Sequence, residues 1–381
     1  MAIHKLTTDI ITDNVIDGTK IAMGSDAVGD IMYYNGTDWV RLAKGEPGEI
    51  LTMNDTETAP QWGTGTPACN FTGTQRGYSC GGWIGPTTEQ SNNIEKYSFS
   101  VDGDSTAPAD LHSSRRFCNG HSSETHGYAT GGYLTSTTVT AQIDRFSFTN
   151  DINATDWADL SGTDKVRAAP ASSCTHGFTY GGEDGLSTNT NVIDKFSFAS
   201  QTPATDWADA VKAQYGGAGC SSDTYGYAMG GIQAAAPGIP SGTIINSIER
   251  YPFATQTTAT NVGSITNYRH TGAGVSSLTH GYCCGGLNVP LSSFNFNIID
   301  RISFANDATV SDHGDLTTPI AHPSASSSTT HGYVCGGNQG GSPGSITLVN
   351  AIQKFAYSSN TLSSGVGEMS IAADGMSGHQ Y

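Results

Sequence analysis

The sequence predicts an all-β chain, in which a six-bladed β-propeller follows a small β-hairpin module and an extended N-terminal segment. Two observations support this prediction: a glycine doublet recurs six times, and an alternating strand phrase follows each doublet. The period is about fifty residues, and a fixed period of that size is typical of repeat architectures. The first glycines of the doublets are Gly81, Gly131, Gly181, Gly230, Gly285 and Gly336.

Each doublet ends a predicted strand. The phrase is complete at 125–132, Thr-His-Gly-Tyr-Ala-Thr-Gly-Gly, and it returns with small changes in the other repeats. Its aromatic residue is typical of a strand, and its final glycines relieve the steric limits on the backbone where the strand stops.

The second phrase reads Ile-Asp-Arg-Phe-Ser-Phe at 143–148, and its apolar residues alternate with polar ones. Alternation at period two predicts a half-buried strand. Two further strands complete each repeat. One is small and polar and precedes Thr-His-Gly, as at 169–174, and the other contains Trp157 or Trp207 in two repeats. Four strands in each of six repeats make a propeller of six blades.

These residues resemble the kelch-repeat family, in which a glycine doublet ends the second strand and an aromatic residue follows on the third. The resemblance covers roughly residues 66–381. The chain departs from the family because the late tryptophan is clear only at Trp157 and Trp207. The stretch from Ser370 to the C-terminus resembles the small polar strand, so we expect it to pair into blade one and close the ring.

The N-terminal region is predicted to be an extended anchoring segment over residues 1–23 and a small β module over residues 24–65. The first segment has too little apolar surface to fold alone and should order against a partner. In the module, Asn35-Gly36 lies between two β-rich runs and predicts a hairpin.

The order of elements from Gly29-Asp30 through Tyr33-Tyr34-Asn35-Gly36 to Ala59-Pro60-Gln61-Trp62 resembles a module near the N-termini of bacteriophage tail fibres and other virion appendages. The resemblance implies that residues 1–65 attach to other virion proteins, commonly in a homotrimer. It also implies a virion location, in a tail or another surface appendage, after assembly in the host cytoplasm.

Composition excludes some partners. The net charge is −17, from 34 acidic and 17 basic residues, which argues against nucleic-acid binding. No apolar run approaches the length of a transmembrane helix, so we expect no membrane insertion. The eight cysteines lack C-x-x-C zinc spacing and are expected to be small buried thiols without disulfides, as in a reducing compartment.

Repeated polar residues invite a catalytic interpretation that their pattern does not favour. The four phrase histidines could hold a metal ion as a ring, but two repeats lack them, so local bonding in a hairpin turn is favoured. The acids of the second phrase each precede a base, which indicates a structural ladder. No catalytic motif is present, so we expect no enzyme activity, no cofactor, and neither catalytic nor metal-binding residues. The histidines are His126, His176, His280 and His331, and the acids are Glu95, Asp144, Asp194, Glu249 and Asp300.

The loops between the second and third strands vary most in length, as expected if loops carry binding. Aromatic rings mixed with polar groups there suit a sugar or a protein partner. We therefore expect a receptor-binding tail fibre that recognises a host surface glycan or envelope protein. The alternatives are a head or tail decoration protein that binds other virion components and, third, a carbohydrate-active or oxidase propeller. The candidate ligand-binding residues are Trp83, Tyr133, Phe294, Phe296, Arg115, Arg116 and Arg269.

Overall fold

The chain separates into two compact units, Met1–Ala68 and Cys69–Tyr381. In the described part, every regular element is a β-strand, and no helix is long and apolar enough to cross a membrane. The predicted anchoring segment lies outside the described residues. The computed structural model describes residues 27–47, 49–54, 58–64, 72–85, 90–162, 165–184, 188–234, 242–288, 294–307, 310–340 and 346–381.

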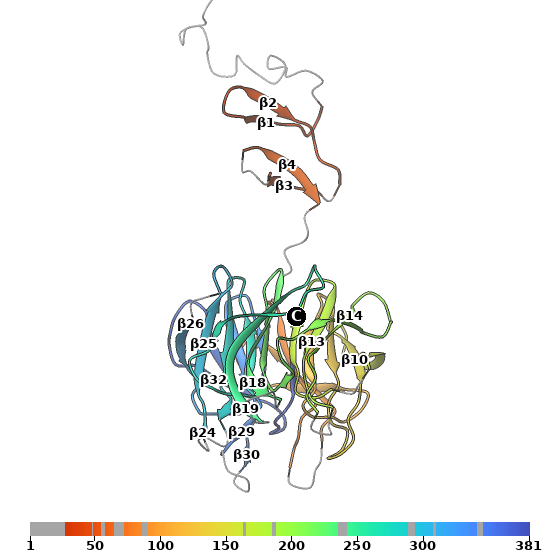
Figure 1. The fold of residues 1–381 in the computed structure, drawn as a ribbon, viewed down its shortest axis with the longest axis vertical. Coiled ribbons are helices and arrows are strands. Elements are labelled where there is room, and N and C mark those ends of the chain that lie inside the picture. The colour runs from red at the N-terminus through yellow and green to blue at the C-terminus, as the bar shows by residue number, and fades with distance from the viewer. Residues whose placement is uncertain are drawn as a thin grey trace, which may run out of the picture. The chain divides into compact units, whose positions relative to one another are not determined.

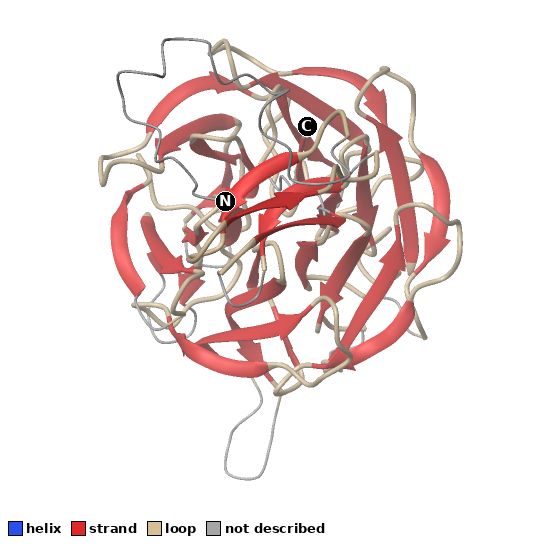
Figure 2. Ribbon diagram, turned by 90° about the horizontal axis from the view of Figure 1, so that it is seen from above, coloured by secondary structure: helices blue, strands red, loops and turns tan. Residues whose placement is uncertain are grey.

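The second unit is a six-bladed β-propeller, which confirms the predicted fold (Figures 1 and 2). Blade one contains β33 (Ser377–Gln380), β5 (Arg76–Cys80), β6 (Asn93–Ser98) and β7 (Thr106–Asp110). Blade two contains β8 (Asn119–Ser122), β9 (His126–Thr130), β10 (Gln142–Ser147) and β11 (Thr155–Asp159). Blade three contains β12 (Ala169–Ser172), β13 (His176–Tyr180), β14 (Val192–Ser197) and β15 (Thr205–Asp209).

The remaining blades follow the same order of antiparallel strands. Blade four contains β17 (Ala218–Ser221), β18 (Tyr225–Gln233), β19 (Thr243–Pro252) and β20 (Thr260–Ser264), and β16 (Gln214–Tyr215) also pairs with β18. Blade five contains β21 (Ala273–Ser276), β22 (His280–Cys284), β25 (Ile298–Ser303) and β26 (Val310–Asp315). Blade six contains β27 (Ser324–Ser327), β28 (His331–Cys335), β31 (Ala351–Ala356) and β32 (Ser364–Glu368). Short ribbons extend the last two blades, β23 (Leu287–Asn288) with β24 (Phe294–Asn295) and β29 (Asn338–Gln339) with β30 (Thr347–Leu348).

The C-terminal strand closes the ring, as the sequence predicts. Strand β33 pairs antiparallel with β5, with Ser377 opposite Cys80 and Gln380 opposite Gly77. Blade one is therefore built from both ends of the propeller, and its second strand has no free edge on that side.

The doublet glycines are required by the close approach of neighbouring blades. At Gly131, φ is 64°, and an added Cβ would lie 2.0 Å from the carbonyl oxygen of Lys165. A side chain there would collide with rigid backbone as well as adopt a conformation that non-glycine residues rarely take. The repeat of glycine at this point thus follows from how each blade meets the next connection.

Aromatic stacks join every pair of neighbouring blades. In each blade, the second strand contains a Gly-aromatic pair, and its aromatic ring stacks on the aromatic residue that ends the third-strand phrase of the next blade. The two ring centroids lie 4.7–5.0 Å apart. Such pairs contribute about 0.5–1.5 kcal/mol beyond burial of their area. The six stacks are Tyr78–Phe148, Tyr128–Phe198, Phe178–Phe253, Tyr227–Phe304, Tyr282–Tyr357 and Phe99–Tyr333.

The acids of the third strand are buried and bind the connection that arrives from the preceding blade. Asp144 accepts a hydrogen bond from the backbone N–H of His112 at 2.9 Å and pairs with Arg115. The acid does not pair with the adjacent base, because neighbouring strand residues point to opposite faces. Arg145, for example, lies over the ring of Trp157 at 3.7 Å.

One cysteine departs from the expectation of buried thiols. Six described cysteines are buried and free, but Cys174 is disulfide-bonded. Strand β12 ends at Ser172, so Cys174 lies in the exposed turn before β13 and not in the small polar strand as expected. Its exposure distinguishes it from the thiols that fill the blade cores.

The first unit contains two hairpins, β1 (Ile31–Tyr34) with β2 (Trp39–Leu42) and β3 (Glu49–Met53) with β4 (Pro60–Thr64). The predicted Asn35-Gly36 turn joins the first pair, and Gly36 has φ of 98°. Large apolar side chains of these hairpins remain about half exposed, including Tyr34 at 54% and Trp39 at 58%. The described residues of this unit form no packed core of the kind that each pair of blades encloses.

Candidate functional site

The candidate site is one mouth of the central channel. A cavity of about 160 Å³ is lined by the first strands of the blades and by the residues that immediately precede those strands. The channel wall is made of small residues, because adjacent first strands nearly touch. A Cβ added at Gly274, for example, would lie 1.9 Å from the carbonyl oxygen of Gly219.

A closed ring of backbone hydrogen bonds surrounds this mouth. The residue two positions before each first strand has positive φ, between 54° and 73°. Each of these residues donates its N–H to the carbonyl of the equivalent residue one blade back, at 2.6–3.1 Å. The ring runs through Phe117, Arg167, Gly216, Thr271, His322 and Gly375, and returns to Phe117. We call these six residues the mouth ring.

Four members of the mouth ring carry side chains in a conformation that suits glycine. The left-handed conformation costs about 1–2 kcal/mol for an ordinary residue, and a β-branched residue such as Thr271 is an outlier there. Gly216 and Gly375 show that glycine satisfies the same hydrogen bonds. Strain of this kind is concentrated at functional sites, so Phe117, Arg167, Thr271 and His322 are candidates for a role beyond folding.

Comparison of the six repeats with one another separates scaffold from site. The strand phrases and doublets have the same residue types in most repeats. The positions around the mouth share a backbone conformation and its hydrogen bonds, but their side chains differ from repeat to repeat. The residue just before each mouth-ring residue forms a backbone β-bridge with the residue just after a glycine doublet. These pairs are Arg116–Tyr133, Val166–Glu183, Tyr215–Ile232, His270–Leu287, Ala321–Asn338 and Asp374–Trp83.

Two arginines and two aromatic rings cluster on one side of the mouth. The guanidinium carbon of Arg167 lies 4.2 Å from the centroid of Phe117, and that of Arg116 lies 5.3 Å from it. Both guanidinium groups also approach the ring of Tyr133, at 5.7 Å each. Arg167 pairs with Glu183, but Arg116 makes no ion pair within the described residues. Burial, and next the charge of Arg167, lowers the pKa of Arg116.

The mouth also carries polar atoms that have no partner among the described residues. Both ring nitrogens of His322 and Nδ1 of His270 are buried and unbonded, although each residue as a whole is partly exposed. Burial, reinforced by Arg167, lowers the pKa of His270 to about 4 and that of His322 well below its usual value. Both imidazoles are therefore neutral at pH 7. The hydroxyl of Thr271 is also buried and unbonded.

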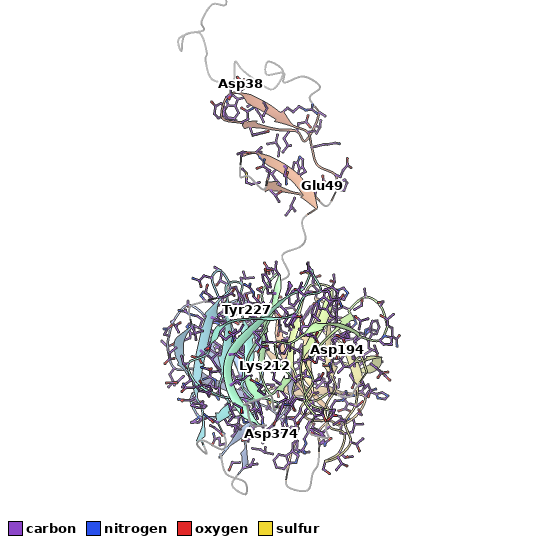
Figure 3. All side chains as sticks on the ribbon, in the orientation of Figure 1. Asp38, Glu49, Asp194, Lys212, Tyr227 and Asp374 are labelled. Atoms are coloured by element: carbon purple, nitrogen blue, oxygen red, sulfur yellow. The ribbon has the colours of Figure 1, made fainter. Side chains whose placement is uncertain are left out.

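Asp374 completes the mouth. It lies toward the end of the propeller that carries β24, β29 and β30 (Figures 1 and 3). Its side chain accepts a hydrogen bond from Asn338 Nδ2 at 2.6 Å through Oδ2, while Oδ1 has no partner. Asp374 is 4% exposed, and burial raises its pKa to about 6.

The structure brings together part of the set predicted from the sequence. Arg116, Tyr133 and Trp83 lie at the mouth, where Trp83 pairs with Asp374 through two backbone hydrogen bonds of 2.8 and 3.1 Å. Phe296 is partly exposed, and its ring centroid lies 5.8 Å from the guanidinium of Arg269. The side chain of Phe294 lies outside what the structure describes.

The expectation that Arg115 and Arg269 lie at the surface is wrong. Arg115 is 0% exposed and Arg269 is 1% exposed, and they pair with Asp144 and Asp300 at 2.9 Å. A buried carboxylate needs a partner, and the connection from the preceding blade supplies a cation at that point. The adjacent positions, Arg116 and His270, face the mouth environment instead.

Sequence reasoning missed Phe117, Arg167, Thr271, His322 and Asp374. The available signal was their place two or three positions before each small polar strand, where the six repeats have no residue type in common. Their backbone conformation could not be read from the residues, because only two of the six mouth-ring members are glycine.

The repeated histidines lie at the opposite end of the strands from the doublets. His126 begins β9, and its Nδ1 lies 2.8 Å from Thr125 Oγ1; His176, His280 and His331 have the same contact with the preceding threonine. The expected local bonding is confirmed. Within the described residues, no group of three His, Cys, Asp or Glu side chains is placed to hold a metal ion.

Comparison of this chain with models of known protein families and with curated proteins found no match.

Proposed function

We propose that this protein is a non-catalytic recognition component of a bacteriophage appendage. The mouth end of the propeller would bind a host surface glycan or envelope protein, and the N-terminal unit would attach to other virion proteins. The binding role is supported by one observation: the side chains at equivalent mouth positions differ among the six repeats. Four of the six equivalent mouth-ring positions hold different side chains, Phe117, Arg167, Thr271 and His322, although Gly216 and Gly375 show that glycine satisfies the backbone there.

The nature of the mouth supports binding. Partly exposed aromatic rings and arginines are the residue types that anchor ligands and protein partners. Trp83, Tyr133 and Arg116 share this end of the blades, and the indole N–H of Trp83 has no partner. The virion assignment is supported separately, by the order of elements in residues 24–65 that resembles tail-fibre modules.

Retention of the purified full chain by bacterial cells and isolated envelopes tests this function. We expect the wild type to be depleted from solution by a host envelope, and Trp83→Ser with Tyr133→Ser to bind at least about tenfold more weakly, because loss of an aromatic anchor costs about 1–2 kcal/mol or more. The matched control is His126→Ser with His176→Ser, which alters the opposite end and should leave retention unchanged.

The alternative is a decoration protein that binds other virion components. Retention by purified particles, with no bacterial envelope taking up the chain, would contradict the receptor-binding role and favour decoration. Loss of retention in the histidine variant alone would show that binding uses the opposite end of the propeller.

A further inference from the structure

The mouth contains one cation, Arg116, that makes no ion pair within the described residues and has only the longer-range attraction of Asp374. This specifies a ligand for the site proposed above. Arg116 has no ion pair or hydrogen-bonded partner for its Nε within the described residues. The other basic residues near the mouth are each compensated, Arg167 by Glu183 and Arg269 by Asp300. The positive charge of Arg116 is held close to that of Arg167, which is electrostatically unfavourable. An anionic group bound to Arg116 would offset this repulsion.

The unbonded atoms of the mouth include both hydrogen-bond donors and acceptors. Oδ1 of Asp374 can only accept, the Nε atoms of Arg116 and Arg167 can only donate, and each neutral imidazole offers one of each. Thr271 Oγ1 can do either. Buried polar atoms are rarely left unpaired, so a ligand with several groups that both donate and accept fits this set. Hydroxyl groups have that property.

The rings and the size of the cavity narrow the ligand further. The ring centroid of Phe117 lies 5.0 Å from that of His322 and 6.3 Å from that of Tyr133. Flat apolar surfaces therefore lie next to the unbonded polar atoms. Sugar rings combine apolar faces with hydroxyl edges. The channel cavity has a volume of about 160 Å³, below the roughly 300 Å³ or more of a drug-sized pocket. Phe117, Thr271 and His322 line it, whereas Arg116, Tyr133 and Asp374 lie outside its lining.

We propose that the channel mouth binds the carboxylate-bearing sugar unit of an acidic surface glycan, with Arg116 pairing with the carboxylate. Phe117 and Tyr133 contact the sugar ring. Asp374, His322 and Thr271 exchange hydrogen bonds with its hydroxyl groups. This inference rests on the proposed recognition function and names the chemistry of its ligand. It also explains why Phe117, Thr271 and His322 are retained at positions where glycine would relieve the backbone.

Titration of the full chain with methyl β-D-glucuronide and methyl β-D-glucoside tests the proposal. We expect the wild type to bind the glucuronide at least about tenfold more tightly, because a charge-assisted pair contributes about 1.5–3 kcal/mol. Arg116→Gln should remove this preference by weakening glucuronide binding to the level of glucoside binding. The matched control is Arg301→Gln, which removes one positive charge near the turn histidine His280 at the opposite end and should bind both sugars as the wild type does.

A second variant separates binding from folding. Thr271→Gly removes an unbonded hydroxyl and a strained β-branched residue, so its melting temperature should equal or exceed that of the wild type. Its affinity for both sugars should fall. An unchanged affinity for both sugars would overturn the assignment of Thr271 to the hydroxyl-binding set.

Four outcomes distinguish failure of this inference from failure of the proposed function. Equal binding of the two sugars by the wild type would overturn the carboxylate pairing. If an acidic peptide binds more tightly than the glucuronide, and Arg116→Gln abolishes this binding, the ligand is an acidic peptide and not a glycan. Retention by bacterial envelopes without binding of either sugar would overturn this inference alone, whereas glucuronide binding without retention by any envelope would support it and contradict the proposed function.

Discussion

At the scale of single residues, Glu249 is a buried acid without a cation. It occupies the blade position at which Asp144, Asp194 and Asp300 have an arginine or lysine partner. Its contacts are the hydroxyl of Tyr180 and the backbone N–H of Val211, and burial raises its pKa from 4.5 to about 7. Blade six carries Gln353 at the same position, where it accepts hydrogen bonds from Thr317.

Glu249→Gln should therefore stabilise the protein at pH 8 and have little effect at pH 5. A carboxyl with a higher pKa in the folded chain binds more protons when folded, so its contribution to stability falls as pH rises from about 4.5 through about 7. A difference of about 2.5 pKa units corresponds to on the order of 3 kcal/mol at high pH. Chemical denaturation of both proteins at the two pH values measures the effect.

Asp300→Asn is the matched substitution at a position that has a cation. It should destabilise the protein by about 3–5 kcal/mol at both pH values, because it leaves the guanidinium of Arg269 buried without a charged partner. Equal destabilisation by the two amide substitutions would contradict this account of Glu249.

At the scale of elements, the sequence predicted what depends on local pattern. The second strands follow from the Gly-aromatic phrase and the doublet, and the third strands follow from alternation over six residues, so both lie where expected. The mouth ring and the partners of the buried acids depend on contacts between blades. Arg115 and Asp144 are 29 residues apart, and nothing near either residue in the chain identifies the other.

Strand β33 is the element whose loss should matter most to the ring. His379 Nδ1 lies 3.0 Å from the carbonyl of His121, Gln380 donates to Ser122 at 3.1 Å, and Tyr381 stacks on Phe148 at 5.3 Å. These contacts join the last strand to blade two as well as to β5 of blade one.

Deletion of residues 377–381 should lower the melting temperature and broaden the transition, because blade one would lose its first strand and its contacts with blade two, and β5 would become an edge. Differential scanning calorimetry measures both. Tyr381→Ser, which keeps the strand and removes one ring, should have a smaller effect. A truncated chain that melts as sharply and at the same temperature as the wild type would contradict closure by β33.

At the scale of the whole molecule, the two units differ in how they bury apolar surface. The propeller encloses aromatic and aliphatic side chains between every pair of blades. In the described part of the N-terminal unit the sheets are two-stranded hairpins, with Ile50, Leu51 and Met53 all about half exposed. An isolated two-stranded hairpin is marginally stable in water at best, so these hairpins need a surface to cover them.

We expect another copy of the N-terminal unit to provide that surface, which makes association of the full chain depend on residues 1–65. Sedimentation equilibrium should show the wild type as an oligomer, with a homotrimer as the expected state. Trp39→Lys with Leu51→Lys should shift it toward monomer, because each lysine places a charge on a half-exposed apolar position. Leu362→Lys, at a 63% exposed position in the propeller, is the control and should leave the oligomer intact. A wild-type chain that remains monomeric at every concentration would show that other proteins cover the hairpins.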